Sequence, residues 1–199
     1  YTPSSAVYRR YAAGITRVLA ERYKDHPALA LWHVDNELGC HVSEFYGEED
    51  AAAFRAWLGR RYGSIEALNA AWGTAFWSQN YGSFDEILPP GVAPSTLNPG
   101  QQLDFQRFNS WALMDYYREL VAVLREVTPG VPCTTNLMAS SATKSMDYFS
   151  WAGDLDVIAN DHYLVAADPE RHIELAFSAD LTRGIAGGDP WILMEHSTS

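Results

Sequence analysis

The sequence has little cysteine, no long apolar run and a shortage of positive charge. Its only cysteines, Cys40 and Cys133, lie far apart, which excludes a disulfide framework and a Cys-x-x-Cys metal motif. No apolar run approaches the roughly 18 residues that a membrane helix needs. Lys and Arg number 14 against 25 Asp and Glu, so the formal net charge is −11, which disfavours contact with nucleic-acid phosphates. We therefore expect neither a nucleic acid nor a membrane as a partner.

The composition is otherwise that of a folded domain. The chain has 199 residues, of which 47% are apolar, and this is enough to bury a sizeable core. Seven Trp, eleven Tyr and eight Phe form either a large core or a surface on which flat ligands such as sugars stack. The sequence starts at Tyr1 without Met and stops at Ser197-Thr198-Ser199 after an apolar run, so we interpret it as part of a longer protein.

Hydrophobic periodicity predicts alternating helices and strands. Apolar residues at steps of three and four, together with capping residues, predict helices over residues 5–24, 49–62, 64–73, 113–127, 145–152 and 168–184. The last of these is expected to start at Asp168-Pro169, with Asp as the cap. Short apolar runs predict strands over residues 28–34, 131–138, 155–159 and 191–194. Residues 74–100 form a long connection between helices, a length typical of functional loops.

Alternating strands and helices predict an α/β fold with a parallel sheet. Each predicted strand ends in polar residues, namely Asn36-Glu37, Asn136, Asp161-His162-Tyr163 and Glu195. Catalytic side chains gathered at strand carboxyl ends are typical of a (β/α)8 TIM barrel. A full barrel needs about 250 residues, so four strands predict an incomplete barrel with edges that other segments must cover.

Two of these strand ends carry the chemistry of glycoside hydrolysis. That reaction needs two carboxyl groups, one protonated to assist the leaving oxygen and one ionised to attack. Glu37 and Glu195 each follow a buried strand that would hold them rigidly. In a retaining enzyme the two carboxyl groups lie about 5–5.5 Å apart, so their separation tests the assignment.

Several segments resemble the β-galactosidases of glycoside hydrolase family 42. They are Tyr1-Thr2-Pro3-Ser4-Ser5, Trp32-His33-Val34-Asp35-Asn36-Glu37-Leu38-Gly39-Cys40-His41, Ala71-Trp72-Gly73-Thr74-Ala75-Phe76-Trp77-Ser78 and Leu193-Met194-Glu195-His196-Ser197. The resemblance spans essentially all 199 residues. It implies a partial catalytic barrel over residues 1–199, about strands 4 to 7, without its first strands, its last strand and later domains.

The resemblance also implies roles for single residues. Glu37 would be the general acid/base at the end of the fourth strand, and Glu195 the nucleophile at the end of the seventh. Asn36 would bind the sugar 2-hydroxyl, Tyr163 would lie near the nucleophile, and Trp77 would line the sugar pocket. Core packing remains the alternative for Trp77 and Tyr163, and capping of a turn remains the alternative for Asn36.

One departure from the family concerns metal. Some members carry a zinc-binding cysteine cluster, and the positions aligned with it here are Thr2, Tyr46, Glu48 and Ala51. Cys40 alone cannot form a tetrahedral thiolate site. The histidines His33, His41, His162 and His196 match no metal motif and are interpreted as structural or rim residues. We therefore predict no metal and no cofactor.

The implied activity is hydrolysis of terminal non-reducing β-D-galactosides with retention, through a covalent galactosyl-enzyme. One alternative is a related retaining enzyme that acts on β-glucosides or α-L-arabinosides. Another is a carbohydrate-binding fragment without turnover. The resemblance further implies a homo-oligomer, a trimer, and we expect a cytoplasmic location. The natural galactoside and its linkage are left open by the sequence.

Overall fold

The computed structural model describes residues 2–140 and 145–197, and it is an α/β structure. Tyr1, which opens the first of the matched segments, and Thr198-Ser199 lie outside the described residues. The helices are α1 (Ala6–Tyr23), α2 (Glu48–Tyr62), α3 (Ile65–Trp72), α4 (Pro99–Val127), α5 (Tyr148–Trp151) and α6 (Arg171–Ile185). The strands are β1 (Trp32–His33), β2 (Cys133–Thr134), β3 (Asn136–Leu137), β4 (Ala159–Tyr163) and β5 (Ile192–Ser197).

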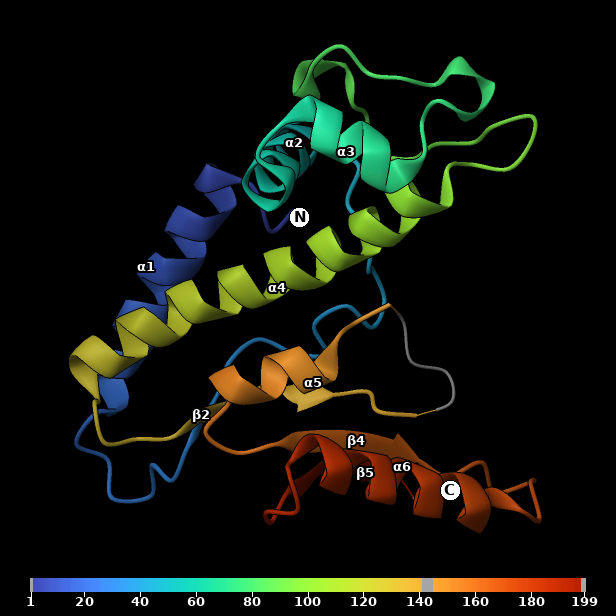
Figure 1. Ribbon diagram of the computed structural model, residues 1–199. Coiled ribbons are helices and arrows are strands. Elements are labelled where there is room, and N and C mark those ends of the chain that lie inside the picture. The colour runs from blue at the N-terminus through green and yellow to red at the C-terminus, as the bar shows by residue number, and fades with distance from the viewer. Residues whose placement is uncertain (1, 141–144, 198–199) are drawn as a thin grey trace.

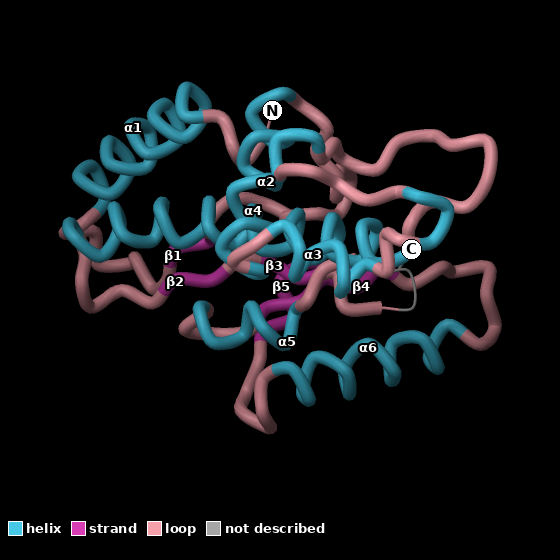
Figure 2. The backbone as a smooth tube through the Cα atoms, turned by 45° about the horizontal axis from the view of Figure 1, so that its top comes forward, coloured by secondary structure: helices cyan, strands magenta, loops and turns pink. Residues whose placement is uncertain are grey.

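All strand pairs described are parallel, as predicted. β1 pairs with β2, β3 with β4, and β4 with β5. Since β2 and β3 are separated by Thr135 alone, they form one extended segment that joins the two sheets in the order β1, β2/β3, β4, β5. The strands lie in the middle of the molecule, with helices outside them (Figure 2). Every strand therefore directs its carboxyl end to the same edge.

Two apolar clusters meet along α4. The 29-residue helix starts at Pro99 and is capped by Asn98, whose side chain accepts the Gln101 N–H. Its C-terminal half packs on α1, α5 and the strands, whereas its N-terminal half packs on α2 and α3 (Figure 1). Phe54 and Phe108 are fully buried in the second cluster. Thus α2 and α3 sit on α4 rather than on the sheet.

Helix α1 forms as predicted, with the Ser5 side chain accepting the Tyr8 N–H. Its predicted apolar face, however, does not lie in the core of the described chain. The six residues of that face expose 44–69% of their surface; they are Val7, Tyr11, Ile15, Val18, Leu19 and Tyr23. The helix instead packs on α4 through a face with small residues such as Ala12, Ala13 and Ala20.

Several predicted boundaries are wrong. Helix α4 begins at Pro99, fourteen residues before the predicted start at 113, and so takes in the end of the predicted connection at residues 74–100. Residues 28–31 lie outside β1, because the chain turns after Pro27, with the Leu29 N–H bonded to the His26 carbonyl. The strand predicted at residues 155–159 is β4, which starts four residues later, at Ala159. The apolar run precedes the strand, and the polar residues after it pair with the neighbouring strands. The last strand continues through Glu195 to Ser197.

The start of α6 also differs from the prediction. The helix begins at Arg171, and Asp168-Pro169 forms the turn before it. The Asp168 side chain still accepts the Glu170 N–H at 2.8 Å, so it stabilises the approach to the helix rather than its first turn. Within the connection at residues 74–100 the structure places two short 3-10 turns, Phe76–Ser78 and Phe84–Glu86. Among the described helices, none is long and apolar enough to span a bilayer.

Candidate active site

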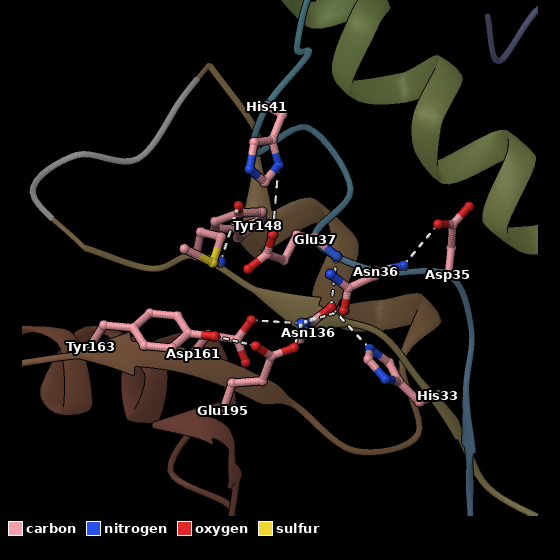
Figure 3. Close-up of polar contacts among 11 residues, drawn as sticks. His33, Asp35, Asn36, Glu37, His41, Asn136, Tyr148, Asp161, Tyr163 and Glu195 are labelled. Carbon is pink, nitrogen blue, oxygen red and sulfur yellow. Dashed lines mark hydrogen bonds and ion pairs between the residues drawn. The ribbon is translucent and has the colours of Figure 1, made fainter. Parts of the chain in front are cut away.

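Three carboxyl groups converge at the carboxyl ends of the strands. Glu37 follows β1, while Asp161 lies in β4 and Glu195 in β5. One oxygen from each lies within 4.8 Å of an oxygen of the other two. Glu37 and Glu195 are 158 positions apart in the sequence (195 − 37), yet their carboxyl groups face one another across a short gap (Figure 3). The parallel order of the strands brings them together.

The segment that carries Glu37 is a strained turn. Asp35 has φ 60° and Glu37 has φ 47°, left-handed values that residues with a Cβ seldom adopt. Two hydrogen bonds hold the turn: the Glu37 N–H donates to Asn136 Oδ1 at 2.7 Å, and the Cys40 N–H donates to the Glu37 carbonyl at 2.9 Å. Backbone strain of this kind persists only where the surroundings enforce it.

The Glu37 side chain is 12% exposed. His41 Nδ1 lies 3.6 Å from Glu37 Oε2, and the His41 ring is largely exposed at 83%. Tyr148 also lies beside this carboxyl group (Figure 3). Burial raises the pKa of Tyr148 to about 12, with smaller contributions from the charges of Cys40, Asp161 and Glu37. The phenol is therefore neutral near pH 7.

A β-bulge aims Glu195 into the site. The pairing of β4 with β5 runs Asn160 to Leu193 and then Asp161 to Glu195, so one extra residue, Met194, is inserted. Residues paired across parallel strands point to the same face. Without the bulge, Met194 would pair with Asp161. The extra residue shifts the register, so that Glu195 pairs with Asp161 instead.

Tyr163 lies against Glu195. Its hydroxyl donates a short hydrogen bond to Glu195 Oε2. This bond is the main reason that the pKa of Tyr163 is raised to about 12. The phenol is thus a permanent donor to the carboxylate.

Asn136 links the segments around the three carboxyl groups, and it is fully buried. Its Oδ1 accepts the Glu37 N–H and also the His33 Nε2–H at 2.9 Å. Its Nδ2 lies 2.6 Å from Asp161 Oδ2 and 3.1 Å from Asn36 Oδ1. Glu195 Oε1 is 3.3 Å from the same nitrogen.

Asp161 is a buried carboxyl group with a raised pKa of about 6. Desolvation is the largest cause, followed by the negative charge of Glu195. The hydrogen bond from Asn136 acts in the opposite direction and favours the ionised form. The Oδ1 atom of Asp161 has no hydrogen-bond partner among the described residues. The site therefore holds one carboxyl group whose ionisation is costly.

This cost predicts a pH dependence of stability. The pKa of Asp161 is higher in the folded chain than in the unfolded one, so its contribution is fully present below about pH 4 and is lost as pH rises through about 6. Asp161→Asn removes this ionisation. Between pH 4 and pH 8 the free energy of unfolding of the variant should gain about 2 kcal/mol relative to wild type. Denaturant titrations of both full-length proteins at several pH values measure it, and a pH-independent difference would contradict the assignment.

The structure brings together four of the five residues that the sequence singled out. Glu37 and Glu195 face each other, Tyr163 bonds Glu195, and Asn36 joins them through Asn136. Trp77 is not among them: it is 62% exposed, stacks on Phe76 at 4.8 Å, and lines a separate cavity of about 280 Å³ beside α3. None of its described contacts reaches the carboxyl groups, and its role in a sugar pocket stays a prediction.

Asn136, Asp161 and Tyr148 also lie in the site, although none of them was predicted to do so. The first two were visible as polar residues at predicted strand ends, a signal sufficient to nominate them. Tyr148 belongs to the short helix α5 and carried no such signal.

Two groups of side chains bring metal-ligand atoms close together among the described residues. One is Glu37, Cys40 and His41, and the other is Glu37, Asp161 and Glu195. Both contain Glu37, so a cation in either would occupy the carboxyl group that the sequence predicts to be the acid/base. His33 and His196 are held by hydrogen bonds to Asn136 Oδ1 and to the His162 carbonyl, in keeping with structural roles. Neither Cys40 nor Cys133 forms a disulfide among the described residues.

A parallel α/β sheet with paired carboxyl groups at its carboxyl edge fits the catalytic domain of a barrel glycoside hydrolase. The comparisons with known proteins make the family specific. The glycoside hydrolase family 42 model, described as beta-galactosidase, matches residues 1–199, and the chain belongs to this family.

The relatives are considerably longer than this chain. A beta-galactosidase of Arthrobacter sp. is 95% identical over all 199 residues, which make up 29% of that protein. The crystal structure of a beta-galactosidase from Marinomonas ef1 is similar with a TM-score of 0.89 and 39% identity, over 98% of this chain and 32% of that one. A beta-galactosidase of Halorubrum lacusprofundi gives a TM-score of 0.92 at 36% identity, over 98% and 31%. The chain thus spans about three tenths of the proteins it matches.

Proposed function

We propose that the full-length protein carrying this chain is a retaining β-galactosidase. The observation that supports this most is the approach of Glu37 and Glu195, since one carboxyl oxygen of each lies within 4.8 Å of one of the other. Retaining glycosidases place the two groups about 5–5.5 Å apart, whereas inverting enzymes leave about 6.5–9.5 Å for a water molecule. The relatives named beta-galactosidase support a galactoside as the substrate.

The two carboxyl groups divide the reaction into two steps. Glu37 donates its proton to the glycosidic oxygen as the bond from that oxygen to the anomeric carbon breaks, and Glu195 attacks the same carbon to form a galactosyl ester. Water then attacks the anomeric carbon, Glu37 takes a proton from that water, and the ester bond to Glu195 breaks. The enzyme returns to its starting protonation, and two inversions yield net retention.

The neighbouring residues assist these steps. The Tyr163 hydroxyl orients the Glu195 carboxylate by donating to Oε2. Asn36 lies at the rim of the carboxyl cluster, where it can bind the sugar 2-hydroxyl, a contact that strengthens in the transition state. Trp77 is kept as a candidate pocket residue on the basis of the family resemblance alone.

A panel of nitrophenyl glycosides tests the substrate. The full-length protein should cleave the β-galactoside faster than the β-glucoside or the α-L-arabinoside, with the product first released as the β-anomer in an NMR time course. Faster cleavage of either competitor would favour the related-enzyme alternative. Sugar binding without turnover of any member would favour the binding-fragment alternative.

We propose further that the described strands are strands 4 to 7 of a (β/α)8 barrel. Four parallel neighbours in chain order and an exposed apolar face on α1 support this, because such a face needs a partner. A structure of the full-length protein in which β1 lacks a further parallel neighbour would contradict it. The trimer and the cytoplasmic location stay predictions, which sedimentation and cell fractionation would check.

A further inference from the structure

The amide of Asn136 lies between the segment that carries Glu37 and the strand that carries Glu195 (Figure 3). Three acceptors surround its nitrogen: Asp161 Oδ2 at 2.6 Å, Asn36 Oδ1 at 3.1 Å and Glu195 Oε1 at 3.3 Å. An amide nitrogen has only two hydrogens. The shortest of the three contacts, to Asp161, therefore holds one of them, and the other is shared between Asn36 and Glu195.

We propose that Asn136 is a positioning residue for the hydrolysis proposed above, and that Asp161 fixes the orientation of its amide group. Through this pair the acid/base segment and the nucleophile strand keep one relative position. The inference rests on the proposed function for its catalytic part, while the hydrogen-bonded pair itself is independent of it.

The donor and acceptor inventory allows the amide one orientation. The Glu37 N–H can only donate, so it requires the amide oxygen. An ionised Asp161 carboxylate can only accept, so it requires the amide nitrogen. If the amide were rotated by 180°, both contacts would become repulsive. The two partners together restrict the amide more than either would alone, because Glu37 defines the position of the oxygen and Asp161 defines that of the nitrogen.

The strained backbone at Glu37 explains why its hydrogen bond to Asn136 matters. With φ at 47°, the backbone of Glu37 favours relaxation to a right-handed or extended conformation. The bond from its N–H to Asn136 opposes that relaxation. A displacement of the acid/base carboxyl group by 1 Å costs about 10²-fold in rate, so loss of this bond should be visible in kcat.

A second buried amide provides a matched control. Asn109 Oδ1 accepts the Phe45 N–H at 3.1 Å, and its Nδ2 donates to the Phe105 carbonyl at 2.7 Å. It is as buried as Asn136 and also restrains a backbone N–H, but none of its described contacts involves a candidate catalytic residue. Asn109→Asp thus reports the cost of placing a carboxylate at a buried amide position away from the site.

The experiment compares four variants of the full-length protein: Asn136→Asp, Asp161→Asn, the double variant with both changes, and Asn109→Asp. Asn136→Asp sets a carboxylate against Asp161 Oδ2. The double variant exchanges the two groups, so that an amide at 161 donates to a carboxylate at 136 while that carboxylate still accepts the Glu37 N–H. Melting temperature, kcat and KM for a nitrophenyl β-galactoside are measured for each.

We expect Asn136→Asp to lower kcat about 10²-fold with KM nearly unchanged. The double variant should recover about tenfold of that loss, the value of one hydrogen bond to a charged group. Recovery should be incomplete, because the carboxylate at position 136 still faces Glu195 Oε1, which contacts the amide nitrogen in the wild type. The double variant should also recover part of the lost melting temperature. Asn109→Asp should lower the melting temperature without a comparable fall in the kcat of the folded enzyme.

Each remaining outcome decides against part of the proposal. A double variant with melting temperature and kcat no better than those of Asn136→Asp overturns the pair. Recovery of melting temperature without recovery of kcat overturns the positioning role and leaves a structural one, as does a wild-type kcat in Asn136→Asp. If the wild-type protein hydrolyses no glycoside, the proposed function fails, and the melting temperatures of the four variants still test the pair.

Discussion

Glu195→Gln in the full-length protein is expected to lower kcat for β-galactosides by about 10⁴-fold or more, because it removes the attacking group. The amide retains the shape of the carboxylate, and its oxygen can still accept the hydrogen bond from the Tyr163 hydroxyl, so the fold should not change. Steady-state rates on a nitrophenyl β-galactoside measure the loss. Glu126→Gln is the matched control, since that carboxyl group pairs with Arg17 on the exposed surface of α4.

Azide separates loss of the nucleophile from general damage. In Glu195→Gly, azide can enter the vacated space and attack the anomeric carbon of an activated galactoside from the side that Glu195 occupied. The product should be α-galactosyl azide, formed with one inversion. A β-galactosyl azide from this variant, or an unchanged rate in Glu195→Gln, would contradict the role of Glu195.

Glu37→Gln is expected to lower kcat/KM by about 10²- to 10⁴-fold for galactosides with poor leaving groups such as alkyl alcohols. A dinitrophenolate leaves without a proton, so the first step on a dinitrophenyl galactoside should proceed at nearly the wild-type rate. The second step still lacks its base, and the galactosyl-enzyme should accumulate with a burst of dinitrophenolate. Stopped-flow absorbance measures that burst.

The dependence on the leaving group is what identifies Glu37 as the acid. Azide needs no base and should accelerate turnover of this variant, giving β-galactosyl azide. An equal loss of activity on alkyl and dinitrophenyl substrates would indicate that Glu37 acts otherwise, for example by holding the fold. The buried position and the backbone contacts of Glu37 make that comparison necessary.

The local structure was largely predictable where short-range rules apply. Ser5 and Ser64 cap α1 and α3 as expected, whereas the start of α4 at Pro99 was not predicted. The apolar face of α1, by contrast, is exposed within the described chain. Periodicity indicates that a face is apolar, but it does not indicate which other segment covers it.

The sequence by itself determined the α/β order, the capped starts of α1 and α3, and the two glutamates at the ends of apolar runs. These follow from the nearest neighbours along the chain, where propensity, capping and patterning act. Only the tertiary structure decided which polar residues meet. The bulge at Met194 turns Glu195 toward Asp161, and Asn136 joins β3 to the turn at Glu37. Strand register and hydrogen bonds across 59 to 100 positions set those contacts, and no local pattern encodes them.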